Sequence, residues 1–203
     1  MPRLIKGARL VVASHNKGKL VEIDELVRPY GLGTVSAGAL GISEPDETET
    51  TFVGNARIKA LHSAVASGLP ALADDSGIEV HALAGEPGVY TANWAGPGRD
   101  FSVAMQRVAD LLTAKGAWGP PAPTANFVSC LCLAWPNGET QEFVGKVYGS
   151  LVWPARGGRG FGYDPMFVPD GGQETYGEME PQMKHATSHR ARAFELFVKA
   201  CFE

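Results

Sequence analysis

A short apolar segment that runs directly into polar residues occurs twice in this chain, and this pattern most constrains the fold. Residues 10–13 (Leu-Val-Val-Ala) lead into Ser-His-Asn-Lys-Gly, and residues 71–73 (Ala-Leu-Ala) lead into Asp-Asp-Ser-Gly. Continuous apolar runs of this kind are typical of strands that are buried on both faces, as in parallel sheets. The sequence therefore predicts an α/β protein in which two parallel strands open into loops on one side, where a cleft is plausible.

Four segments carry apolar residues at helical spacing and surround these strands. They are 19–28, 51–67, 100–115 and a last helix that Ser188 can cap. In the last helix the spacing predicts a buried face of Ala193, Leu196, Phe197 and Ala200.

A hairpin is predicted over residues 126–135 and 140–151, because the Asn137-Gly138 pair between them tolerates the positive φ angles of a tight turn. Segments 74–77 and 156–169 are predicted to be loops, and no element is predicted for the stretch from there to Thr187. The result is a chain of strands and helices with one antiparallel element.

Composition excludes several classes of protein. With 203 residues, 44% hydrophobic and 20% charged, the chain is long enough for one packed domain or two small lobes. The formal net charge of −4 gives no general basic field, so no nucleic-acid partner is expected. The three cysteines lack a redox or zinc spacing, and no apolar run near the start suits export or a bilayer, so we expect a cytoplasmic protein without membrane contact.

The loop after the first strand suits an anionic phosphate. It places a hydroxyl, an amide and two ammonium groups at the start of a predicted helix, whose backbone N–H groups favour negative charge. It is not a P-loop, because Ala13 stands where that motif has glycine and Leu20 where it has serine or threonine. The alternative is an ordinary polar loop with a helix cap.

Asp74 and Asp75 form the sharper signal. Two adjacent carboxylates after a buried strand repel each other unless a cation or a proton relieves them, and Mg²⁺ prefers such oxygen ligands. The alternative is a turn, since Asp-Ser-Gly often bonds to its own backbone.

Lys59 and Glu47 are further candidates. Lys59 lies one helical turn from Asn55, so both side chains can reach the same bound anion; the alternative is that Lys59 lies on a solvated face. Glu47, in an acidic loop, can approach the metal or remain solvated.

Two further segments suit a bound ligand, one by its shape and one by its charge. Residues 157–165 combine four glycines, two aromatic rings and an acid, which favours a slot for a flat heterocycle or, alternatively, a glycine-rich turn with core aromatics. Residues 184–190 gather cations at the start of the last helix, where positive charge opposes the helix dipole and asks for an anionic or carbonyl partner. A surface patch is the alternative there.

Taken together, six separated motifs closely resemble the inosine triphosphate pyrophosphatase family. They are Ser14–Lys19, Thr51-Phe52 with Asn55-Ala56 and Lys59-Ala60, Ala73–Gly77, Pro87–Tyr90, Gly160–Pro165, and Lys184 with Ser188–Ala191. The resemblance implies an α/β fold of two lobes of mixed sheet flanked by helices around a central nucleotide-binding cleft, within one domain over 1–203. It also implies a homodimer, Mg²⁺ dependence, and hydrolysis of dITP, ITP and XTP to the monophosphate and pyrophosphate, which cleanses the nucleotide pool.

The resemblance carries over residue by residue. Asp75 matches the catalytic and metal-binding carboxylate. A second metal ligand is left unassigned, because Ala39-Leu40-Gly41 stands where many relatives have Leu-Pro-Glu; Glu47 is the substitute, because it aligns with an acidic position of the family next to Thr48. Lys184 is followed by His185 where asparagine is usual. The implied substrate-binding residues are Ser14, His15, Asn16, Lys17, Gly18, Lys19, Lys59, Ser76, Phe161, Gly162, Tyr163, Asp164, Lys184, His189 and Arg190.

Two rival functions stay open at this point. One is a nucleotide pyrophosphatase with another base preference, resembling the Maf proteins, against which the 160–165 segment argues. The other is a module that binds the nucleotide without hydrolysing it. A 6-keto group on the base would accept from His189 or Arg190, whereas the amino group of adenine would oppose them, so ATP is expected to be a poor substrate.

Overall fold

The strands form a six-stranded mixed sheet in the computed structural model, which describes residues 7–202 but not the side chain of Lys17. The sheet order is β2-β1-β3-β4-β5-β6. The strands are β1 (Arg9–Val12), β2 (Gly33–Ser36), β3 (Ala71–Val80), β4 (Thr124–Ala134), β5 (Thr140–Leu151) and β6 (Phe167–Pro169). β1 pairs in parallel with β2 and β3, and β5 pairs antiparallel with β6. The predicted α/β class and the parallel pair of strands are confirmed.

Five α-helices accompany the sheet within the described residues. They are α1 (Lys17–Val27), α2 (Phe52–Ser67), α3 (Phe101–Ala114), α4 (Pro181–Thr187) and α5 (His189–Phe202). Side-chain caps define their starts: the Thr51 hydroxyl accepts from the N–H of Gly54, and the Asp100 carboxylate accepts from that of Ser102. Each cap satisfies a backbone donor that the first turn leaves without a partner, which explains why the helices begin there.

The predicted loop at residues 74–77 is wrong, because β3 continues through it to Val80. The acids remain in the strand because both are buried with polar partners, described below. Ile78 and Val80 beyond them are fully buried and extend the apolar pattern. A buried strand can therefore include carboxylates when the neighbouring elements supply cations and hydroxyl groups.

The C-terminal third also differs from the prediction. Leu196 and Ala200 of α5 are exposed, and the buried stripe consists of Ala193, Phe194, Phe197, Val198 and Cys201. The stripe turns because Phe194 and Phe197 both pack into the same aromatic cluster. The three-residue β6 lies in the segment predicted to be loop, and α4 lies in a stretch with no predicted element, since neither is long enough to show a periodic pattern.

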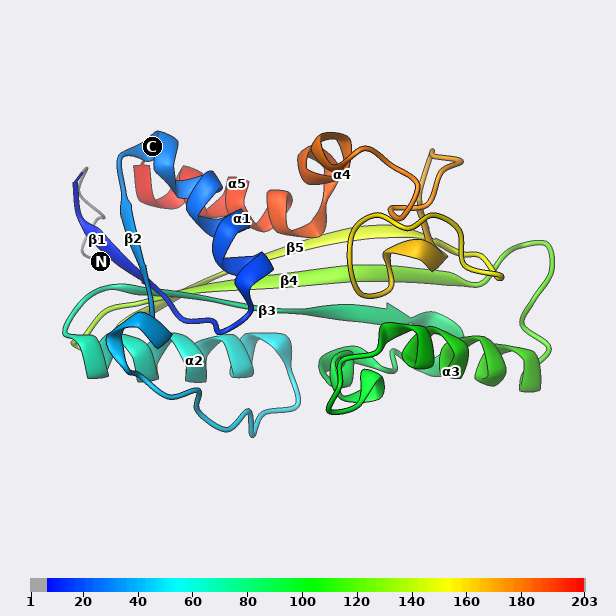
Figure 1. Cartoon of the computed structure of the whole chain (residues 1–203), viewed down its shortest axis with the longest axis horizontal. Coiled ribbons are helices and arrows are strands. Elements are labelled where there is room, and N and C mark those ends of the chain that lie inside the picture. The colour runs from blue at the N-terminus through cyan, green and yellow to red at the C-terminus, as the bar shows by residue number, and fades with distance from the viewer. Residues whose placement is uncertain (1–6, 203) are drawn as a thin grey trace. The chain divides into compact units, whose positions relative to one another are not determined.

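The chain divides into two compact units. The first comprises the chain up to Asp75, Ser129–Gly145 and the chain from Arg192 onward. In this unit α2 lies along one face of the strands and α1 and α5 lie along the other (Figure 1). Its core is formed by apolar side chains of β1, β3, β4, α1 and α5.

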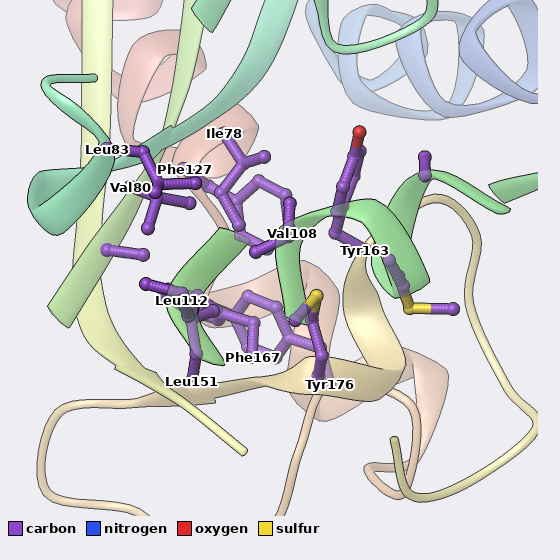
Figure 2. Packing of buried hydrophobic residues seen from close by; sticks show 14 of the residues in the cluster. Ile78, Val80, Leu83, Val108, Leu112, Phe127, Leu151, Tyr163, Phe167 and Tyr176 are labelled. Atoms are coloured by element: carbon purple, nitrogen blue, oxygen red, sulfur yellow. The ribbon is translucent and has the colours of Figure 1, made fainter. Parts of the chain in front are cut away.

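The second unit comprises Ser76–Val128 and Lys146–Ala191. Figure 2 shows its core, in which Val108 and Leu112 of α3 meet Ile78 and Val80 of β3. Among the described residues, no helix is both long and apolar enough to span a bilayer. The expectation of one functional domain over the whole chain stays a prediction.

Candidate active site

Asp74 and Asp75 are both buried but have different partners. Asp74 Oδ1 accepts a 2.6 Å hydrogen bond from the Ser129 hydroxyl, and Asp74 Oδ2 lies 2.9 Å from Lys19 Nζ of α1. Asp75 Oδ1 instead lies 2.7 Å from Lys59 Nζ of α2. Consecutive strand residues point to opposite faces, and α1 and α2 lie on opposite faces of this unit (Figure 1), so the two carboxylates serve different helices.

Lys59 joins two carboxylates. Its ammonium donates 2.7 Å hydrogen bonds to Asp75 Oδ1 and to Glu47 Oε1, and its side chain is only 7% exposed. Asn55, one turn earlier on α2, accepts a hydrogen bond from the N–H of Glu49 and so fastens the acidic loop to the helix. The solvated alternative for Lys59 is therefore wrong, and the predicted proximity of Lys59, Asp75 and Glu47 is present in the structure.

Burial and charge shift the pKa values of this group. Burial raises the pKa of Asp75 above its ordinary value, although Lys59 opposes the shift. Burial alone would lower the pKa of Lys59, but Asp75 and Glu47 together raise it. Lys59 is thus held as a cation between two acids, and Asp75 retains more affinity for a proton than an exposed aspartate does.

The same residues fit a divalent metal ion. Asp75 Oδ2 is buried and has no hydrogen-bond partner, although a buried carboxylate oxygen normally has one. The described residues contain no cluster of three or more His, Cys, Asp or Glu side chains suited to a metal. Mg²⁺ needs no such cluster, because it usually takes one or two protein carboxylates and completes its shell with waters and substrate phosphates. Asp75 and Glu47 together supply two such carboxylates.

The loop before α1 forms the predicted helix cap. Asn16 Oδ1 accepts from the N–H groups of Gly18 and Lys19, and the Ser14 hydroxyl accepts from the N–H of Asn16. His15 is partly exposed, with Nδ1 3.8 Å from the carboxylate of Glu44. The Lys17 side chain lies outside the described residues. A phosphate-binding role for this loop stays a prediction.

In the second unit, Asp164 and Lys184 form a buried ion pair at 2.5 Å. Asp164 Oδ2 also accepts a 2.7 Å hydrogen bond from the N–H of Phe161, and Lys184 Nζ lies 4.4 Å from the centre of the Phe161 ring. Gly160 permits this arrangement: its φ of +76° is unfavourable for other residues, and a Cβ there would overlap the Asp164 carboxylate. The Phe161 ring, 45% exposed, is free to stack on a flat ligand.

His189 and Arg190 are buried at the start of α5, so the surface-patch alternative is wrong for them. The His189 ring stacks on Phe127 of β4, with ring centroids 5.0 Å apart and 15° between the planes. Arg190 Nη2 donates a 3.3 Å hydrogen bond to the Ser76 hydroxyl, which brings two predicted contacts together.

Tyr163 and Gly162 of the predicted base-binding segment play mainly structural parts in the structure. The Tyr163 ring is buried, and its hydroxyl donates to the carbonyl oxygen of Thr91. Burial raises the pKa of Tyr163 well above its ordinary range, so the phenol stays protonated. Gly162 adopts φ of +67° opposite the ring of Phe101. A direct contact of either residue with a base stays a prediction.

Ser129 and Phe127 contact predicted site residues although no sequence motif marks either of them. Both stand in the apolar strand 126–135, where Ser129 is a lone hydroxyl among residues such as Val128 and Leu131. A polar side chain within a continuous apolar run signals a buried hydrogen bond, because an unpartnered hydroxyl there would be costly. Phe127 gave no such signal, since aromatic residues are ordinary in a strand.

The mixed sheet flanked by helices, with a buried lysine–carboxylate group in each unit, defines the chain as an α/β protein with charged groups in its interior. The sequence profile of the Ham1 family matches residues 10–200. The chain therefore belongs to the Ham1 family, which confirms the relationship inferred from the motifs.

Close relatives cover nearly the whole chain. The dITP/XTP pyrophosphatase of Agrobacterium fabrum is 57% identical, and the alignment covers 96% of this chain and 96% of the relative. The protein of the same name from Caulobacter vibrioides is 55% identical, over 97% of this chain and 100% of the relative. Among solved structures, a HAM1 protein from Coxiella burnetii is 36% identical with a TM-score of 0.88, covering 95% of this chain and 98% of that protein.

Proposed function

We propose that this chain is a nucleoside triphosphate pyrophosphatase that hydrolyses noncanonical purine nucleotides, dITP, ITP and XTP, to the monophosphate and pyrophosphate. The names of relatives at 55–57% identity support this substrate class. The observation in this chain that carries the proposal is the buried group of Lys59, Asp75 and Glu47, in which one oxygen of Asp75 has no partner. Such a group suits a reaction that brings a cation and a polyphosphate together.

Hydrolysis of a phosphoanhydride requires that the charge of the polyphosphate is neutralised and that a water is oriented in line with the bond. In our proposal Lys19 and Lys59 hold the triphosphate, and other side chains of the Ser14–Lys19 loop add donors. Asp75 accepts the proton of the water that attacks the α-phosphorus, and pyrophosphate leaves. The raised pKa of Asp75 supports this role, because a base with greater proton affinity removes a proton from water more readily.

Asp75 and Glu47 are the residues that would hold Mg²⁺. When bound, the ion would supply positive charge against the phosphate oxygens. Glu47 suits this role because its side chain is 39% exposed while its partner Lys59 is buried, so one of its oxygens faces solvent-accessible space. Lys59 donates hydrogen bonds to both carboxylates and so holds Asp75 and Glu47 close together.

The base is assigned to the second unit. Phe161 offers a partly exposed ring for stacking, and the Asp164–Lys184 pair holds its backbone and ring in place. His189 and Arg190 carry the donors that a 6-keto oxygen would accept from, and Phe127 fixes the plane of the imidazole. Adenine would present an amino donor to the same groups, which predicts discrimination against dATP.

The test is product analysis with purified protein, Mg²⁺ and dITP, with dATP and dGTP run in parallel. Formation of dIMP and pyrophosphate from dITP, and little product from dATP and dGTP, is the expected result. Release of orthophosphate with dIDP would contradict attack at the α-phosphorus.

Metal removal is a separate test. Excess EDTA should abolish turnover, and added Mg²⁺ should restore it; full activity in EDTA would contradict the metal assignment.

Two further parts of the proposal concern the setting of the enzyme. We place it in the cytoplasm, because nucleoside triphosphates are made and consumed there. We also assign it a homodimeric state, which sedimentation equilibrium at micromolar concentration tests directly: a mass of one 21.5 kDa chain would contradict it.

A further inference from the structure

Ser129 is a buried polar residue that the proposed reaction leaves without a role. It lies on β4, is fully buried, and donates a 2.6 Å hydrogen bond to Asp74 Oδ1. Its neighbours along the strand, Val128 and Cys130, are buried apolar residues. A hydroxyl in such surroundings is retained at low cost only when it has a partner, and here the partner is a carboxylate whose side chain is itself 0% exposed.

The second oxygen of Asp74 extends this contact to Lys19. Asp74 Oδ2 lies 2.9 Å from Lys19 Nζ, and the backbone oxygen of Asp74 lies 3.4 Å from the same nitrogen. The Lys19 side chain is 16% exposed, so the ammonium is largely enclosed but reachable. An ammonium has three N–H donors, and two contacts with Asp74 leave a third that can be directed at an anion.

We propose that Ser129, acting through Asp74, is a positioning residue for Lys19, the ammonium that receives the polyphosphate. This inference rests on the proposed function for the identity of the anion. The Ser129 hydroxyl contacts the Asp74 carboxylate, which contacts the Lys19 ammonium. The three residues belong to three different elements, β4, β3 and α1.

The hydroxyl matters because the terminal torsion of an aspartate side chain has a broad preference and does not by itself fix the carboxylate plane. Ser129 holds one oxygen, which directs the other at Lys19. Lys19 has four rotatable bonds, so without a fixed partner its ammonium samples many positions. A lysine that is already in place loses less freedom when the phosphates arrive.

The first test is the Ser129→Ala variant with dITP and XTP as substrates. We expect KM to rise about tenfold and kcat to stay within about twofold, because a contact with the phosphates is made equally in the bound and reacting states and one charge-assisted hydrogen bond is lost. The factor should be the same for both substrates, since the base is not involved. An unchanged KM would overturn the proposal.

A double-mutant cycle separates positioning from general loosening of the fold. In a Lys19→Met background, Ser129→Ala should change KM less than about twofold, because the residue it positions is already absent. An equal rise of KM with and without Lys19 would overturn the proposal. Ser63→Ala is the matched control: Ser63 is a buried serine of the same unit, on α2, and its loss should leave KM unchanged.

Two additions keep the test decisive. If Ser129→Ala does not fold, as judged by circular dichroism, Ser129→Cys replaces the hydroxyl by a weak donor of similar shape and should raise KM in the same direction. Calorimetric titration with inorganic tripolyphosphate then separates the two proposals. Tighter binding by wild type than by the variant, with no hydrolysis of dITP, would leave the positioning role standing and overturn the proposed function; hydrolysis with equal tripolyphosphate affinities would do the reverse.

Discussion

Each of the two units contains a buried lysine–carboxylate pair, and the two pairs differ in what surrounds them. Lys59 and Asp75 are 2.7 Å apart, with a second carboxylate, Glu47, on the same ammonium. Lys184 and Asp164 are 2.5 Å apart, with the Phe161 ring against the ammonium. In the first group one ammonium lies between two carboxylates, whereas in the second one ammonium lies between one carboxylate and an aromatic ring.

The second carboxylate and the aromatic ring lead to different chemistry. A group with one unmatched carboxylate and an unpartnered oxygen attracts a cation, because its electrostatic energy falls when positive charge approaches. The Asp164–Lys184 pair, with the Phe161 ring against its ammonium, instead holds a backbone segment and an aromatic face in one position. In our proposal the same two residue types thus make a reactive group in one unit and a rigid binding surface in the other.

The strongest test of this contrast is Asp75→Asn, which removes one of the two carboxylates and preserves the shape of the side chain. We expect kcat for dITP to fall at least about 1,000-fold, since the variant loses both the base and a metal ligand. The rate is measured by pyrophosphate release at saturating Mg²⁺. Asp46→Asn, which neutralises an exposed acid beside Glu47, is the control and should keep nearly full activity. Equal activity of the Asp75 variant and wild type would remove the catalytic assignment.

The second test breaks the Asp164–Lys184 pair. Lys184→Met leaves the buried Asp164 without its cation, so the free energy of unfolding should fall by about 3 kcal/mol in urea denaturation. Adding Asp164→Leu removes the stranded charge and should return part of that stability. KM for dITP should rise in the single variant and stay raised in the double variant, because Phe161 loses its contacts with Lys184 and Asp164. Recovery of KM along with stability would show that the pair has no part in binding the base.

A third test acts on the backbone under the same pair. Gly160→Ala places a methyl group at the position of the Asp164 carboxylate and at a φ of +76°, and should cost about 1–3 kcal/mol. KM for dITP should rise with it, because Asp164 must move away from the N–H of Phe161. Gly158→Ala is the control: a Cβ there meets open space, and a φ in the left-handed region is not required. Equal effects of the two substitutions would contradict this explanation.

The smallest effect is expected at a lysine–carboxylate pair that is only partly buried. Burial opposes ionisation of Glu79, but hydrogen bonds from Asn126 and Lys146 outweigh it and lower its pKa below the ordinary value of 4.5. The stability that this charge contributes is present above pH 4.5 and is lost as pH falls through the lower, folded-state pKa. Glu79→Gln should therefore cost about 1 kcal/mol or less at neutral pH. In thermal melts the difference from wild type should shrink as the pH falls below 4.5 and through the lowered pKa of Glu79, and a constant difference would contradict the charge-based explanation.

Sequence patterns predicted those parts of the fold where local chemistry decides the outcome. The helix start at Asp100 and the hairpin around Asn137-Gly138 depend on a few neighbouring residues, and both are present. The course of β3 could not be predicted locally. Asp-Asp-Ser-Gly has the composition of a turn, and only partners from distant segments, such as Lys19 and Lys59, make an extended buried conformation favourable for it.

The candidate site divides in the same way. The motifs singled out Lys59, Asp75 and Glu47, and the structure brings these three side chains together; their roles stay predictions. The separate task of Asp74 was not predictable, because two adjacent acids look equivalent until their strand is placed between two helices. Ser129 is 55 residues from Asp74 in the chain, and no local pattern connects them.

The alternation of side chains along β3 makes the lysine partner of each acid a matter of parity. Asp74 and Asp75 are chemically identical, and what separates them is whether an odd or an even number of residues precedes them in the strand. Deleting one residue between Ala71 and Asp74 would send the remaining acids to the wrong helices without removing a single charge. Exchange of one side chain for another at these positions is thus a milder change than the loss of one peptide unit. Evolution of this segment is accordingly expected to proceed by substitution and not by insertion or deletion.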